Sequence, residues 1–287
     1  MESARASNAR AIVRVAHSPD SDDAFMFYAL ATGQVDTEGI TYVHELQDIE
    51  TLNQRARRGD LDVSAVSIHA YAYLTGRYVL LPHGASMGDR YGPRLVTRSP
   101  RTRGDLAGAR IAIPGPLTSA YLALRLWLPD FVAVPVPFDL IGPAVTAGDV
   151  DAGLLIHEGQ LTYADDGLQL VVDLGTWWHE ETGLPLPLGG NVVRRDLGAA
   201  LIAKISRHLH ASIAHGLRHR ASALDHAMSY ARGLPRDRAD TFVGMYVNEW
   251  TLDYGERGRE AIRTLLARGA AAGIIPHSVT VEFAAGP

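Results

Sequence analysis

The chain is 287 residues long, with 47% apolar and 21% charged residues and a formal net charge of −5. This composition is typical of a globular protein with one large domain or two smaller ones, and the acidic balance argues against a nucleic-acid-binding surface. Because the sequence contains no cysteine, it excludes disulfides, thiolate catalysis and cysteine-ligated metal centres.

The N-terminal stretch and the hydropathy of the chain bear on location. Residues 1–10 are polar, and we expect them to be disordered. No apolar core of signal-peptide length precedes the first predicted strand, and no stretch reaches the ~18 uninterrupted apolar residues of a membrane span. We therefore expect a cytoplasmic protein that does not associate with membranes.

Strand-like and helix-like segments alternate through the first hundred residues. The predicted strands are 11–16, 40–46, 63–66, 79–82 and 94–98, and the predicted helices are 23–32, 49–58 and 68–75. Alternation of this kind indicates a mainly parallel sheet with crossover helices.

A second cycle of alternating segments begins near Asp105. Its predicted strands are 110–113, 131–137, 152–156 and 168–174, and its predicted helices begin at Thr118 or Ser119 and within 139–149. The segment 185–196 then crosses back. After it the chain is nearly all helical, with predicted helices Ala199–Arg220, Ser222–Arg232, Arg236–Glu249 and Glu256–Ala272.

An α/β unit bracketed by another α/β unit and a helical tail suggests two lobes joined by two crossings. We expect a discontinuous first lobe, 11–100 together with 191–287, and a second lobe, 101–190, with hinges near 97–104 and 188–193. This is the plan of the type II periplasmic-binding-protein fold, in which a ligand lies in the cleft between the lobes.

The apolar run at residues 152–156 has the length of a buried strand, and it delivers His157 and Glu158 into a polar turn. Ligands bind beyond the carboxyl ends of strands in open α/β sheets, and a histidine there titrates near neutral pH. We therefore predict that His157 faces a ligand and acts as a general base. A purely structural histidine is the competing interpretation, and Glu158 either orients the ring or is a simple surface acid.

Metal sites are not expected. No spaced set of carboxylates and histidines accompanies His157 along the sequence. His215 and His219 lie four residues apart on one helix face, but Gly216 stands where a His-Glu-x-x-His motif needs its glutamate. For this pair, a solvated helix face is the favoured interpretation.

In the segment HSPDSDDAF, residues 17–25, a strand ends in a polar turn and a helix follows. Asp22 can cap that helix, whose free N–H groups can meet an anion or a polar ligand. A plain capping turn does not require His17 and Ser18 at the strand's end. We therefore favour a ligand-facing wall that contains Ser18 and Asp22.

Hydroxyl residues stand at two more junctions of strand and helix. Ser67 lies where a short strand meets a helix, so it either holds a carboxylate or merely caps the helix. No Gly-x-Ser-x-Gly elbow surrounds it, which argues against a nucleophilic serine. Thr118 and Ser119 head a helix after Gly115 and Pro116, and a helix N-terminus suits an anion.

With these segments collected, the chain resembles the 1,4-dihydroxy-6-naphthoate synthases of the futalosine route to menaquinone, which have the periplasmic-binding-protein fold. The resemblance runs from about Val13 to Ile275. The segments that carry it are HSPDSDDAFMFYAL, DIETLNQRARRGDLDVSAVS, YGPRLV, GPLTSAYLAL, AGLLIHEGQLTY, TGLPLPLGGNVVRRDLG and YVNEWTLDYG. The pairing of LLIHE with TGLPLPLG is the most specific of them.

The resemblance implies that His157 is the proton acceptor. It also implies that substrate binds at residues 65–67 and 118–119, namely Ala65, Val66, Ser67, Thr118 and Ser119. The implied substrate is cyclic dehypoxanthinyl futalosine, a small molecule with an aryl carboxylate, and the implied reaction expels a sugar-derived fragment without any metal or redox cofactor. Nothing in the sequence gives the oligomeric state.

One position departs from the family pattern. Some members place a lysine two residues before the substrate-binding serine, where this chain has Ala65. The substrate carboxylate must then be held by hydroxyls and backbone N–H groups, or by a cation elsewhere, for which Arg94 is a candidate.

Two other functions stay open at this point. A non-catalytic solute-binding protein could have the same fold, but it has no need of a titratable base in its cleft. A chorismate dehydratase, a sister enzyme of the same pathway, is disfavoured because the IHEGQLTY and TGLPLPLG segments resemble the naphthoate synthases.

Overall fold

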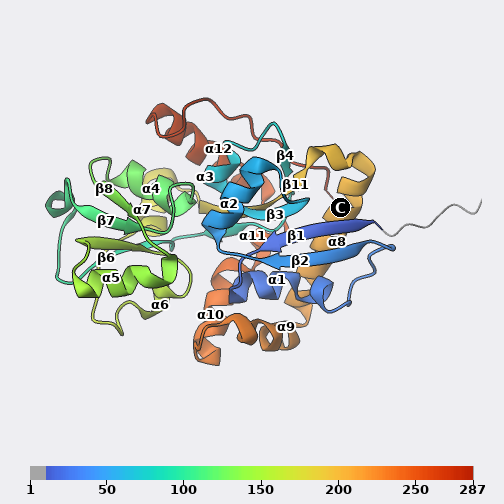
Figure 1. Ribbon diagram of the computed structural model, residues 1–287, viewed down its shortest axis with the longest axis horizontal. Coiled ribbons are helices and arrows are strands. Elements are labelled where there is room, and N and C mark those ends of the chain that lie inside the picture. The colour runs from blue at the N-terminus through green and yellow to red at the C-terminus, as the bar shows by residue number, and fades with distance from the viewer. Residues whose placement is uncertain (1–10, 287) are drawn as a thin grey trace, which may run out of the picture.

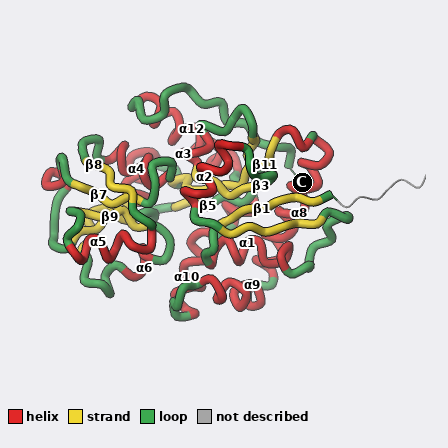
Figure 2. Tube along the Cα trace, viewed as in Figure 1, coloured by secondary structure: helices red, strands yellow, loops and turns green. Residues whose placement is uncertain are grey.

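The computed structural model describes residues 11–286, so the disorder expected for residues 1–10 falls outside the described residues. Two separate β-sheets lie side by side, with helices around them (Figures 1 and 2). The first sheet has the strand order β2-β1-β3-β11-β4, and β5 also pairs with β11. Its strands are β1 (Ile12–His17), β2 (Thr41–Leu46), β3 (Val63–Ser67), β4 (Tyr78–Leu80), β5 (Ser86–Gly88) and β11 (Leu186–Arg194).

The second sheet, on the left in Figure 1, has the order β10-β6-β9-β7-β8. Its strands are β6 (Arg94–Thr97), β7 (Arg110–Ile113), β8 (Val132–Pro135), β9 (Ala152–Leu155) and β10 (Gln169–Asp173). The helices that follow strands in these two parts of the chain are α1 (Ser21–Ala31), α2 (Ile49–Arg58), α3 (Ile68–Tyr71), α4 (Ser119–Trp127), α5 (Ile141–Ala147), α6 (Gly159–Thr162) and α7 (Leu174–Thr182).

Both sheets are mixed, so the prediction of a mainly parallel sheet is wrong. The pairs β1–β2, β1–β3, β7–β8 and β7–β9 are parallel, as crossover helices require. The antiparallel pairs all involve β11 or β6. The strand β6 follows the first passage of the chain between the sheets, and β11 follows the second. Each runs antiparallel to its neighbours in its own sheet.

The strand β6 belongs to the second sheet, where it pairs with β9 and β10. The strand β5, a few residues earlier, belongs to the first sheet. The chain therefore passes between the sheets before Arg94, earlier than the hinge expected at 97–104. The return passage is also earlier than expected, because β11 already pairs with β5 at Leu186.

The C-terminal part is helical, as predicted. It comprises α8 (Ala199–Arg218), α9 (Arg220–Ala227), the 3₁₀ helix η4 (Met228–Tyr230), α10 (Arg236–Tyr246), α11 (Glu249–Leu252) and α12 (Gly255–Ala271). In Figure 1, α9 and α10 lie below α1, whereas α12 lies on the opposite side of the first sheet. None of the helices described within 11–286 is long and apolar enough to cross a bilayer.

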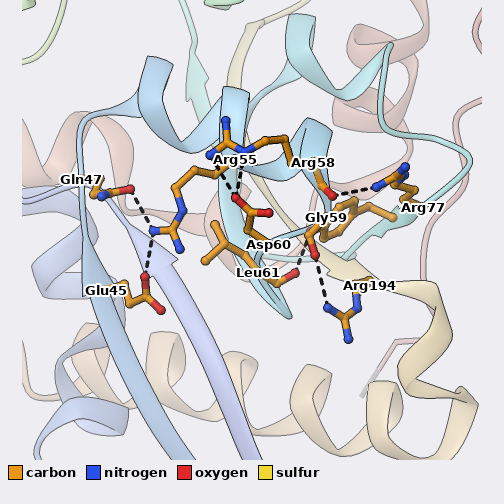
Figure 3. Close-up of polar contacts among 10 residues, drawn as sticks. Glu45, Gln47, Arg55, Arg58, Gly59, Asp60, Leu61, Arg77 and Arg194 are labelled. Carbon is orange, nitrogen blue, oxygen red and sulfur yellow. Dashed lines mark hydrogen bonds and ion pairs between the residues drawn. The ribbon is translucent and has the colours of Figure 1, made fainter.

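The helix α2 has the bounds that the sequence predicts, and its end is capped by distant side chains (Figure 3). Gly59 ends it with a left-handed φ of 81°, a conformation that glycine adopts without steric cost. Arg77 donates to the carbonyl of Arg58 at 2.7 Å, and Arg194 donates to the carbonyl of Gly59 at 3.3 Å. Because the last carbonyls of a helix lack intrahelical donors, these arginines fix α2 against the first sheet.

The two sheets share an apolar core. The largest cluster of buried side chains joins Val66 and Val192 of the first sheet to Ile111 and Leu154 of the second. The helix α4 contacts β11 of the first sheet and β9 of the second, so it bridges the sheets, and α12 packs against α4 and β11. Trp178 is fully buried in this cluster, and Trp177 is partly buried against it.

Candidate active site

A cavity of about 700 Å³, partly open to solvent, lies between the two sheets. The carboxyl ends of β1 and β3 reach it from the first sheet, and those of β7 and β9 reach it from the second, as expected for ligand sites in α/β folds. Eight of the residues that the sequence singles out for ligand binding or catalysis line it. These residues are Ser18, Asp22, Ala65, Val66, Ser67, Thr118, Ser119 and His157.

His157 forms an ion pair with Asp20 across the cavity wall, with 2.9 Å between Nδ1 and Oδ2. The side chain of Asp20 is 2% exposed and that of His157 is 17% exposed. Because the carboxylate accepts from Nδ1, Nε2 is the ring nitrogen left for proton transfer. The two residues thus form the pair of groups that general-base catalysis requires.

The sequence does not single out Asp20, which lies in the polar turn of the segment HSPDSDDAF. In the structure α1 begins at Ser21, and Asp20 takes the N-cap position without a side-chain capping bond to any described residue. The prediction that Asp22 caps this helix is wrong, because Asp22 lies inside its first turn. The segment SPDSDD contains more acidic residues than one helix start can use for capping, and this excess could have pointed to a further role for Asp20.

The buried charges of this wall shift one another's pKa values. Burial works to lower the pKa of His157, but the negative charge and hydrogen bond of Asp20 outweigh it and raise that pKa above its ordinary value. Burial likewise works to raise the pKa of Asp20, and the charge of His157 holds it below its usual range instead. Burial, with the charge of Asp20, raises the pKa of Asp22 well above its usual range. Both effects favour the protonated form of the Asp22 carboxyl group.

Asp23 and Ser18 complete this wall. The backbone N–H of Ser18 donates to Oδ2 of Asp23 at 2.7 Å, and burial raises the pKa of the Asp23 carboxyl to about 8. His17, in contrast, does not line the cavity. Its ring stacks on Phe27 at 4.3 Å and burial lowers its pKa to about 4, so it is a neutral core histidine.

Asp20, Asp22 and His157 each bring one potential metal-ligand atom within 4.8 Å of the others. The sequence does not reveal this set, because Asp20 and Asp22 lie far from His157 along the chain. The ion pair with His157 uses one oxygen of Asp20, whereas Oδ1 of Asp20 and Oδ1 of Asp22 have no hydrogen-bond partner among the described residues.

A second set of lining residues, Ser67 and the start of α4, is neutral and forms what we call the neutral wall. Ser67 ends β3 and takes the N-cap position of α3, but its hydroxyl makes no capping bond within the described chain. Instead Asn53, which is fully buried on α2, donates to the Ser67 hydroxyl at 3.1 Å and accepts from the Ser67 N–H at 2.9 Å. Because that hydroxyl accepts from Asn53, its own hydrogen can be donated to a ligand. Nothing in the sequence pointed to Asn53.

The hydroxyls that begin α4 are already engaged. Thr118 donates to the carbonyl of Gly115 and accepts from the N–H of Tyr121, so it is the helix cap. Ser119 donates to the carbonyl of Leu188 at 2.6 Å and accepts from the N–H of His69 at 3.1 Å. The first N–H groups of a helix have no intrahelical acceptor. The groups that α4 offers to an anion are therefore its first backbone N–H groups.

Arg94 does not supply the missing cation. It pairs with Asp173 at 3.2 Å and donates to the carbonyl of Gln160. Within residues 11–286, no Lys or Arg lines the cavity. A carboxylate in this cavity would therefore have to be held by neutral donors.

Glu158 is not a simple surface acid. It does not line the cavity, and the Nδ1 atom of His157 pairs with Asp20 rather than with Glu158. It is 8% exposed, and its Oε2 lies 3.7 Å from Arg232. Glu158 is thus a buried acid that faces an arginine of the C-terminal helical region.

Comparison with known proteins places this site in a family. A family model described as menaquinone biosynthesis matches residues 13–271. A 1,4-dihydroxy-6-naphthoate synthase from Thermus thermophilus is 43% identical over 93% of this chain and 97% of its own length. The corresponding enzyme from Streptomyces coelicolor is 40% identical over 92% of this chain and 95% of its own length.

Solved structures agree on the fold. A crystal structure of a protein from Archaeoglobus fulgidus is 48% identical, with a TM-score of 0.88 over 92% of this chain and 98% of its own. The alkanesulfonate-binding protein SsuA from Xanthomonas axonopodis pv. citri is 16% identical, with a TM-score of 0.69 over 94% of this chain and 96% of its own. The predicted periplasmic-binding-protein fold is therefore confirmed. Together with the sequence matches, this shows that the chain belongs to the menaquinone biosynthesis family.

Proposed function

We propose that the protein is a carbon–carbon lyase that converts cyclic dehypoxanthinyl futalosine into 1,4-dihydroxy-6-naphthoate in the cytoplasm. The observation that carries the proposal is the ion pair between His157 and Asp20 in the cavity of a chain that matches naphthoate synthases over nearly its whole length. A binding protein with this fold would have no use for such a pair.

In the proposed reaction, Nε2 of neutral His157 takes a proton from the substrate. The electron pair that this releases moves into the ring system, the bond to the sugar-derived fragment breaks, and the bicyclic ring becomes aromatic. Asp20 orients the imidazole through Nδ1 and stabilises the imidazolium that forms. The electron pair of the broken bond leaves with the fragment, and we assign to the Asp22 carboxyl group, which lines the same cavity, the proton that this fragment gains.

We assign the aryl carboxylate to the neutral wall. The Ser67 hydroxyl and the first N–H groups of α4 can donate to it, and each hydrogen bond to a charged group contributes about 1.5–3 kcal/mol. Ala65 leaves room where some relatives carry a lysine. The apolar residues that line the same cavity, among them Ile49, Leu188 and Phe242, suit the ring system.

We further propose that the parts of the chain built around the two sheets act as lobes that close over the substrate. The division then falls between β5 and β6 and between α7 and β11, rather than at residues 100 and 190. Closure would exclude water from the reacting centre.

The direct test is to incubate the purified protein with cyclic dehypoxanthinyl futalosine and to follow formation of 1,4-dihydroxy-6-naphthoate by mass spectrometry. We expect product with the wild-type protein and none with His157→Ala. Binding of the substrate without any release of naphthoate by the wild-type protein would instead indicate a solute-binding protein.

A further inference from the structure

Arg232 lies outside the cavity, in the turn between η4 and α10, and nothing in the sequence singles it out. Its backbone has a left-handed φ of 50°, and Gly233 follows with a φ of 81°. Two successive left-handed residues turn the chain sharply and direct the Arg232 side chain toward the segments that carry Asp20 and His157.

The guanidinium of Arg232 makes three contacts. It donates to the carbonyl of Pro19 at 3.2 Å, and it lies 3.7 Å from Oε2 of Glu158. It also lies over the ring of Phe138, 4.3 Å from its centroid. That ring in turn meets the imidazole of His157 edge-on, with 4.9 Å between the ring centroids.

Each contact reaches an immediate neighbour of the ion pair. Pro19 precedes Asp20 along the chain, Glu158 follows His157, and Phe138 packs against the His157 ring. Asp20 and His157 come from different sheets, so their relative position depends on how the two turns are held together. Arg232 joins those turns from the side of the C-terminal helices.

We propose that Arg232 is a positioning residue that holds the His157 turn and the Asp20 turn in register, so that the ion pair keeps the geometry that proton transfer needs. The inference rests on the proposed role of His157 as the base. An error of about 1 Å in the position of a catalytic group can lower a rate by about 100-fold.

The chemistry of guanidinium suits this role better than that of an ammonium group. Arginine is planar, so it stacks on an aromatic ring while its edge donates to several acceptors at once. A lysine can pair with Glu158 or donate to Pro19, but it cannot also cover the Phe138 ring. Oε1 of Glu158 has no hydrogen-bond partner among the described residues, so Arg232 is its counter-charge as well.

A control is available in the same region. Arg238 of α10 pairs with Asp165, which follows α6, so it joins the C-terminal helices to the same part of the second sheet. Arg238 and Asp165 are both largely exposed, and neither contacts a neighbour of the ion pair. A mere clamp between the two regions would be weakened equally by Arg232→Met and Arg238→Met.

The test compares the steady-state kinetics and the downfield proton NMR spectra of Arg232→Met, Arg232→Lys and Arg238→Met. A proton on His157 Nδ1 that is shared with a carboxylate gives a resonance well downfield of the amides. For Arg232→Met we expect kcat to fall about 10- to 100-fold, KM to change little, and this resonance to broaden or vanish. We expect Arg232→Lys to restore only part of the loss and Arg238→Met to match the wild type.

Wild-type kcat in Arg232→Met would overturn the proposal, and so would an equal loss in Arg238→Met. If Arg232→Met does not fold, Arg232→Lys decides, because wild-type kcat together with an unchanged resonance in that variant would overturn the role of the three contacts. The resonance also separates this inference from the proposed function. Wild-type protein that releases no naphthoate would overturn the function, and an active His157→Ala enzyme would remove His157 as the base. The dependence of the His157 resonance on Arg232 is measured without turnover.

Discussion

The two walls of the cavity differ in the chemistry of the groups that they present. The titratable wall, formed by Asp20, Asp22, Asp23 and His157, buries four ionisable groups that shift one another's pKa values. The neutral wall, formed by Ser67 and the start of α4, offers hydroxyl and backbone donors whose partners are themselves neutral. The proposed function assigns proton transfer to the first wall and substrate anchoring to the second, so substitutions on the two walls should change different kinetic constants.

The strongest test of this contrast is removal of the base. His157→Ala and His157→Asn should lower kcat by about 10²- to 10⁴-fold or more, while the affinity for substrate stays near that of the wild type. Single-turnover product formation and calorimetric binding check the two parts of the prediction. Near-normal turnover in either variant would remove His157 from the proposed mechanism.

Asp20→Asn should have the next largest effect, a loss in kcat of about 10²- to 10⁴-fold, because the imidazole loses the group that fixes its tautomer. The pH profile gives a second readout. In the wild type, kcat/KM should fall as the pH drops through the raised pKa of His157, since the protonated ring cannot act as a base. Without the Asp20 charge that pKa is lower, so this acidic limb should move to lower pH. An unmoved limb would show that another group controls it.

On the neutral wall, Ser67→Ala should raise KM by about 10-fold with little change in kcat, since one hydrogen bond to a charged group contributes about 1.5 kcal/mol or more. Ser64→Ala is the matched control. Ser64 lies on the same strand, is fully buried, and donates to the carbonyl of Ala65 without lining the cavity. A fall in kcat for Ser67→Ala would show that the two walls do not divide the work in this way.

The smallest expected effect concerns stability. Burial raises the folded pKa of Asp22 well above its unfolded value, so folding favours the protonated carboxyl group. The wild type therefore loses stability as the pH rises from the unfolded value of about 3.9 toward the folded one. The Asp22→Asn variant has no titrating group at this position. The difference in melting temperature between this variant and the wild type should therefore shift in the variant's favour as the pH rises from 4 to 8. A constant difference across that range would mean that Asp22 is ionised in the folded state.

The sequence predicted the parts of the site that are local. The helix 49–58 and the strand 110–113 have the predicted bounds, and the residues at the four strand ends line one cavity. These features depend on short-range patterns of apolar residues, caps and glycines, which the sequence displays directly.

What escaped prediction depends on contacts between distant segments. Asp20 and His157 are far apart in the chain, and only the approach of the two sheets makes them partners. Asn53 looks like any polar residue on a helix until Ser67 is placed beside it. Likewise, nothing in the local sequences of β6 and β11 predicts their antiparallel direction. That direction follows from where the chain crosses between the sheets.

The backbone at His157 has a left-handed φ of 52°, a conformation that costs a residue other than glycine about 1–2 kcal/mol. Glycine would occupy the position without that cost, but it would supply no imidazole. The residue that best suits the turn and the residue that can take a proton are therefore different amino acids. The proposed role of His157 as a base accounts for a histidine at this turn, because glycine would relieve the backbone and remove the proton acceptor.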